Sequence, residues 1–135
     1  MTSQEAKKVL KYHSFTHEDI DHPKMENGFL GMLRPFSGKL TEENYHEVME
    51  AIRTLSSEIR SNEYIEKDII SAIWGICHLT RMWAIEKEGT LRSNNLINEE
   101  QISKLAQWVE NISYATMMIL DGSDDATAFD FVETE

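Results

Sequence analysis

The chain has 135 residues and a formal net charge of −11, with 24 acidic side chains against 13 Lys and Arg. That length suits a single domain able to bury a core unaided, and the acidic balance argues against a protein that grips nucleic acid by its phosphates. A lone cysteine excludes a disulfide framework. The N-terminus lacks a signal-peptide core, and no stretch approaches the roughly 20 apolar residues of a membrane span, so we expect a cytoplasmic protein without membrane contact.

The first 40 residues are the least regular part of the sequence. Residues 3–12 predict a short helix. Thr16, followed by Glu18 and Asp19, resembles the start of another helix. Both prolines and three of the six glycines lie between residues 23 and 38, which indicates an irregular segment. Within it, residues 28–34 are the one candidate strand and suit a helix equally well.

The first of three long helices is predicted over residues 42–60, with Thr41 as its N-cap. Its apolar residues recur every three or four positions and form one stripe, made of Tyr45, Val48, Met49, Ile52, Leu55 and Ile59. Glu43, Glu47 and Glu50 lie outside this stripe. The pattern is that of an amphipathic helix with an acidic face.

The second long helix is predicted over residues 64–87. Its apolar residues cover most of the circumference, which is typical of a central helix, so we expect it to be the most buried. Gly75 lies inside it at a cost of about 1 kcal/mol relative to Ala, and close approach of a neighbouring helix or a kink would explain its presence.

The third long helix is predicted over residues 99–121, because Asn98 and Gln101 have capping-box spacing and Gly122 follows its end. The chain then becomes acidic without a base, through Asp121, Asp124, Asp125, Asp130, Glu133 and Glu135. The sequence therefore predicts an all-α bundle over residues 1–122 and an acidic tail over 123–135, which could dock through residues 129–131.

Motifs for catalysis are weak. The segment around Gly38 and Lys39 lacks the spacing and hydroxyl of a phosphate loop. The single Glu-x-x-His pair, Glu43 and His46, faces away from the apolar stripe, unlike the ligands of a di-iron bundle. Cys77 lies mid-helix on the apolar side, which predicts a buried, inert thiol. We expect neither an enzyme nor a cofactor.

The densest group of metal-ligand types is His13, His17 and His22 together with three nearby carboxylates. Such a set could hold Zn²⁺ with one open position. The loop-like composition around it favours a solvated polar loop instead, so no metal is predicted. A metal-dependent enzyme or metal-binding domain that uses these histidines remains an alternative.

An aromatic residue lies on the polar side of the second long helix. Trp74 falls in the middle of a strip made of Lys67, Ser71, His78 and Arg81. One interpretation is that the N-terminal segment or the tail half covers it. Another is an exposed Trp/Arg hot spot for a protein partner. A compromise between them is that residues 129–131 fold onto the strip, with Asp130 facing Arg81 or Lys67.

These features favour a small acidic inhibitor that blocks a basic partner in a one-to-one complex, of the kind formed by a bacterial immunity protein and a nuclease-type toxin. A homodimeric regulatory subunit, associating through Tyr114 and Met118, is a further alternative. The candidate partner-binding residues are Glu18, Asp19, Asp21, Glu43, Glu47, Glu50, Trp74, His78, Arg81, Asp121, Asp124 and Asp125.

Overall fold

The computed structural model describes residues 1–131, and this part of the chain is an all-α bundle, as predicted. Four helices exceed ten residues: α1 (Ser3–His13), α3 (Glu42–Ser61), α4 (Lys67–Thr80) and α6 (Glu99–Leu120). Three helices are short: α2 (Pro23–Asn27), α5 (Thr90–Ser93) and α7 (Asp125–Ala128). A π-helical turn, η1 (Arg81–Ile85), continues α4. Among the described helices, none has the length and hydropathy that a bilayer crossing requires.

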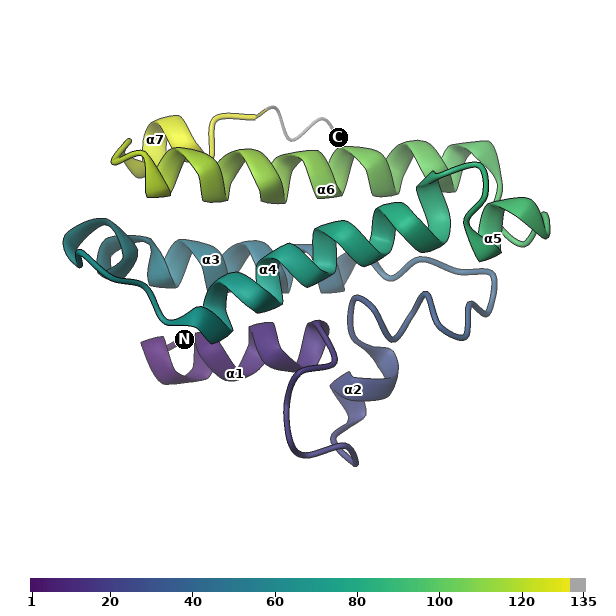
Figure 1. The fold of residues 1–135 in the computed structure, drawn as a ribbon, viewed down its shortest axis with the longest axis horizontal. Coiled ribbons are helices and arrows are strands. Elements are labelled where there is room, and N and C mark those ends of the chain that lie inside the picture. Colours follow the sequence, from purple (N-terminus) through teal and green to yellow (C-terminus); the bar gives the residue numbers. More distant parts are fainter. Residues whose placement is uncertain (132–135) are drawn as a thin grey trace.

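The four long helices form a bundle in which α6 and α1 lie on opposite sides of α3 and α4 (Figure 1). Helices α1 and α6 each pack against both α3 and α4. The core fills the space among them with fully buried side chains from every long helix, including Leu10, Ile52, Leu55, Ile76, Leu105 and Ile112. Burial of these apolar stripes provides the main drive for folding.

Side-chain hydrogen bonds cap the starts of two long helices. Thr2 and Glu5 form a capping box on α1, and Asn98 and Gln101 form the predicted one on α6. Helix α4 begins at Lys67 rather than at residue 64. Its N-cap, Glu66, has an extended backbone, and the Glu66 carboxylate accepts a hydrogen bond from Lys7 Nζ at 2.8 Å. The long second helix predicted from periodicity is therefore shorter at its start and changes to π geometry after Thr80.

Helix α4 packs on α1 and α6 and leaves one side exposed. Trp74 of α4 is 71% exposed, and Met82 of the following η1 turn is 50% exposed. Of the two explanations offered for Gly75, close approach of a neighbouring helix is wrong. A Cβ atom built there would meet no neighbouring atom within 4 Å, so no close helix approach requires a glycine.

The stretch between α1 and α3 contributes to the core despite its irregular backbone. Phe29, Leu30 and Leu33 are almost completely buried, within a segment that is neither helix nor extended strand. No helix starts at Thr16, whose hydroxyl lies 2.8 Å from that of Ser14. The next helix, α2, starts at Pro23.

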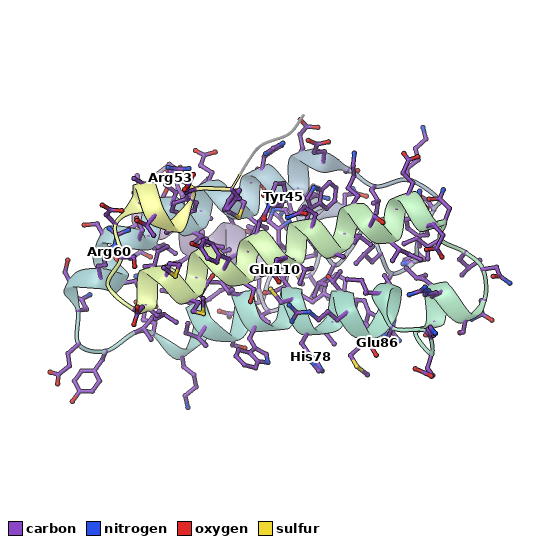
Figure 2. The ribbon with its side chains drawn as sticks, turned by 90° about the horizontal axis from the view of Figure 1, so that it is seen from above. Tyr45, Arg53, Arg60, His78, Glu86 and Glu110 are labelled. Carbon is purple, nitrogen blue, oxygen red and sulfur yellow. The ribbon has the colours of Figure 1, made fainter. Side chains whose placement is uncertain are left out.

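The beginning of the acidic tail docks on the bundle. Asp125 of α7 forms an ion pair with Arg60 of α3, and the Arg53 guanidinium lies 4.1 Å from the centre of the Phe129 ring. Arg53 and Arg60 lie on the α3 side of α6, whereas His78 lies on the other side (Figure 2). The predicted contact of Asp130 with Arg81 or Lys67 is therefore wrong. Glu133 and Glu135 lie outside the described residues.

A candidate protein-binding groove between α4 and α6

A groove of about 390 Å³ runs between α4 and α6 on the side of the bundle away from α7. Helix α4 and the start of η1 form one wall, and the second half of α6 forms the other. The lining residues are Ile70, Ile73, Trp74, Cys77, His78, Arg81, Ser113, Thr116, Met117 and Leu120. Their spacing of three or four positions along each helix gives the groove two continuous walls.

Three large apolar side chains are exposed together in this groove. Trp74 is 71% exposed, Met117 57% and Leu120 53%. Neither α1 nor the described part of the tail covers the indole, so the interpretation of Trp74 as a covered residue does not hold. Contiguous exposed apolar surface bordered by polar groups is typical of a site that binds another molecule.

One end of the groove is polar, because His78 and Arg81 line it on the C-terminal side of Trp74. Arg81 is exposed and makes no ion pair with any residue in the range 1–131. The described lining includes no carboxylate, although the chain as a whole has a net charge of −11. The groove is thus a neutral-to-positive surface on an acidic protein.

Cys77 lies in the floor of this groove. It is 6% exposed, and burial raises its pKa to about 11, with Glu110 also raising it and Arg81 lowering it. The thiol is therefore protonated at neutral pH and is a poor nucleophile, which agrees with the predicted buried thiol.

The structure brings together the predicted residues Trp74, His78 and Arg81 but not the acidic ones. Glu18, Asp19 and Asp21 are exposed in the loop between α1 and α2 (Figure 1). Glu43 and Glu50 are exposed on α3, and Asp121 follows Leu120 at the end of α6. These carboxylates are distributed over several faces of the molecule.

Two predicted acidic residues of the tail have structural partners. The Asp124 side chain caps α7 by accepting a hydrogen bond from the Thr127 N–H at 2.9 Å, which lowers the pKa of Asp124. Asp125 is paired with Arg60. Both carboxylates therefore help to hold α7.

Glu47 has inward partners as well, in a cluster that joins α1, α2 and α3. Its carboxylate accepts hydrogen bonds from Lys24 Nζ at 2.5 and 2.7 Å and from His13 Nε2–H at 2.6 Å. His13 is fully buried, and its Nδ1 accepts the Phe29 backbone N–H at 2.8 Å. Glu47 is thus not free on an acidic outer face.

The pKa values in this cluster follow from its contacts. Burial lowers the pKa of His13 and outweighs the opposing effect of Glu47, while Lys24 adds to the lowering. The Phe29 N–H acts in the same direction, because a protonated Nδ1 would be unable to accept it. Burial alone would raise the pKa of Glu47, but hydrogen bonds from Lys24 and His13 leave it lowered.

The other two histidines of the candidate metal-ligand group, His17 and His22, lie apart from this cluster. The rings of His17 and His22 both stack on Tyr12, with centroid distances of 4.1 and 3.8 Å. His17 Nδ1 accepts the Asp19 N–H, and His22 Nδ1 accepts the Lys24 N–H at the start of α2. Within residues 1–131, no group of three or more His, Cys, Asp or Glu is arranged to hold a metal ion.

Sequence reasoning missed the α6 wall of the groove. Met117 and Leu120 are the exposed apolar residues of α6, whereas Tyr114 and Met118, proposed as exposed, are partly buried.

The chain matches no protein-family model, and comparisons with curated proteins and with solved structures give no significant match. The groove is therefore the main basis for a functional assignment.

Proposed function

We propose that the protein is a stoichiometric inhibitor that binds another protein through the groove between α4 and α6. The observation that carries the proposal is the 71% exposure of Trp74 above an apolar groove, beside Arg81, which has no ion-pair partner within residues 1–131. Tryptophan and arginine dominate the energetics of protein interfaces, and truncating one such residue commonly costs about 2 kcal/mol or more of binding free energy. An indole held on a regular helix also loses little conformational entropy on binding.

The charge of the chain supports a basic partner. Exposed carboxylates at Glu18, Asp19, Asp21, Glu43, Glu50 and Asp121 contribute to the net charge of −11. A field of this sign attracts a basic protein over distances up to about one Debye length, roughly 8 Å at physiological salt, and raises the association rate. In this scheme the carboxylates speed the encounter, and the groove sets the lifetime of the complex.

The specific class that we propose is an immunity protein that acts in the bacterial cytoplasm and blocks a basic, nuclease-type toxin. Active sites that bind nucleic acid have basic surfaces, because they must contact phosphates. An acidic protein of this size competes for such a surface and occludes it in a one-to-one complex. The product of a neighbouring reading frame is the first candidate partner.

The proposal is tested by immobilising the wild-type protein and two variants and exposing them to the candidate partner. Trp74→Ala removes the exposed indole, and Tyr64→Ala is the matched control, since Tyr64 is an exposed aromatic in a loop outside the groove. We expect wild type and Tyr64→Ala to capture one basic protein in a one-to-one ratio and to inhibit it. Trp74→Ala should lose most of this binding, and equal capture by all three proteins would refute the groove as the contact surface.

The electrostatic part of the proposal has its own test. Replacing Glu18, Asp19 and Asp21 together by the corresponding amides should slow association and leave dissociation nearly unchanged. Association of the wild type should also slow steeply from low to physiological salt. Association that is insensitive to salt would show that these carboxylates do not steer the partner.

A further inference from the structure

We infer that the groove receives one amphipathic helix of the partner, which lays apolar side chains along Trp74 and Met117 and presents a carboxylate to Arg81. The inference rests on the proposed function, because it names the element of the partner that the groove binds. The groove's shape and its charge support it separately.

The shape of the groove matches a helix. Its α4 wall runs from Ile70 to Arg81, eleven positions along the chain. At a rise of 1.5 Å per residue, this distance is about 16 Å, or three helical turns. The walls are two neighbouring helices that run in opposite directions (Figure 1). A third helix can lie between them, with anchors at positions i, i+4, i+7 and i+11 facing the groove.

The chemistry of the groove changes along its length. Ile70, Met117 and Leu120 make one end apolar, whereas His78 and Arg81 make the other end polar. A helix with a continuous apolar stripe would fill the first end and the centre. Its residue at the Arg81 end must be compatible with a guanidinium group.

Charge complementarity identifies that residue. Arg81 is exposed, has no ion-pair partner within residues 1–131 and faces no carboxylate in the described lining. Glu110 of α6 also affects Cys77 but does not line the groove. A guanidinium binds a carboxylate through two parallel hydrogen bonds and repels a lysine at the same place. The groove thus selects an acidic residue on a partner whose overall surface is basic, and this combination provides specificity.

A second copy of this chain fits the groove less well. Association through the same face would bring together two molecules that each have a net charge of −11, and like charges oppose that approach. A helix from a basic protein has no such penalty.

The experiment uses a display library of helical peptides and the full-length protein. Four positions at i, i+4, i+7 and i+11 vary among apolar residues, and the positions one turn beyond either end of this stripe vary among all amino acids. Selection is run in parallel on wild type and on Arg81→Glu. We expect wild type to enrich Asp or Glu at one of the end positions and Arg81→Glu to enrich Lys or Arg at the same position.

Selected peptides are then measured by calorimetry on two further variants. Trp74→Ala should weaken binding about thirtyfold, as for an interface hot spot, and Tyr64→Ala should leave it unchanged. Failure to select any helical peptide on wild type, or peptides that bind Trp74→Ala equally well, would overturn the inference. So would sedimentation that shows a dimer dependent on Trp74, because the groove would then belong to a second copy.

The outcomes separate the inference from the proposed function. If helices bind in a Trp74-dependent manner while Trp74→Ala still captures and inhibits the basic partner, the groove is a helix-binding site, but the inhibited partner does not supply the helix and the proposed inhibitory surface is wrong. If Trp74→Ala loses the partner but no helix is selected, the inhibitory surface stands and the helix is the wrong occupant.

Discussion

Removal of the buried His13 ring should destabilise the protein strongly, because this side chain connects three segments of the fold. Its Nδ1 accepts a hydrogen bond from the Phe29 backbone N–H at 2.8 Å, and its Nε2–H donates one to the Glu47 carboxylate at 2.6 Å. In His13→Leu the Phe29 N–H is left buried without an acceptor, which costs about 1–3 kcal/mol. Loss of the hydrogen bond to the Glu47 carboxylate adds only about 1–2 kcal/mol, because Lys24 still donates hydrogen bonds to that carboxylate.

The total of about 2–5 kcal/mol is a large part of the 5–15 kcal/mol that stabilises a typical domain, so the effect is easily measured. Two further variants separate the two bonds. The amide oxygen of His13→Asn can replace Nδ1 toward Phe29, and the amide nitrogen of His13→Gln can replace Nε2 toward Glu47. We expect each to cost about 2 kcal/mol, less than His13→Leu, in urea unfolding followed by circular dichroism.

The same residue predicts how stability depends on pH. The pKa of His13 lies below its ordinary value of 6.5 in the folded protein. As the pH decreases through 6.5, the unfolded chain therefore binds a proton at His13 before the native state does. The free energy of unfolding should therefore be highest above pH 6.5 and fall as the pH decreases below it. Glu47, whose pKa is also lowered, adds a loss in the same direction below its ordinary value of 4.5.

His13→Asn should remove the part of the decline that begins near pH 6.5. Nitrogen NMR of the wild type should show the Nε2–H tautomer of His13 at neutral pH. Parallel pH profiles for wild type and His13→Asn, or a His13 ring that is protonated above pH 6.5, would refute this reasoning.

Four other predictions concern stability and reactivity. Gly75→Ala should raise the free energy of unfolding in urea by about 1 kcal/mol, because it lies in a helix with open space around it, whereas Gly28→Ala should lower it, because a Cβ there would lie 2.3 Å from the Lys24 carbonyl oxygen. Cys77, with its pKa near 11, should react with a thiol reagent at pH 7.5 far more slowly in the native than in the unfolded protein. The melting temperature should be the same with and without a strong chelator, and a large drop would show that a metal contributes to folding.

Periodicity predicted the parts of the fold in which local sequence dominates. The starts of α3 and α6 agree with the expected positions, because an apolar stripe and, for α6, a capping box act over a few residues. Trp74 interrupts a polar strip of the sequence pattern, and the structure shows that its side chain is exposed there.

Contacts between segments that are distant in sequence determine the features of the fold that periodicity does not predict. Burial of Phe29 depends on an acceptor that is distant in sequence, His13, so an irregular segment forms part of the core. Glu47 faces inward because Lys24 and His13 meet it there. The tail docks on Arg53 and Arg60 rather than on the Trp74 strip, and sequence spacing contains no signal for that choice.

The most direct test of the proposed binding surface is the dissociation rate of the complex between this protein and the proposed basic partner. It should be measured by surface plasmon resonance for wild type, Trp74→Ala and the control Tyr64→Ala. If Trp74 anchors the interface, Trp74→Ala should dissociate about thirtyfold faster, with little change in association rate, and Tyr64→Ala should match the wild type. A dissociation rate that is the same in all three proteins would show that the groove between α4 and α6 is not where the partner binds.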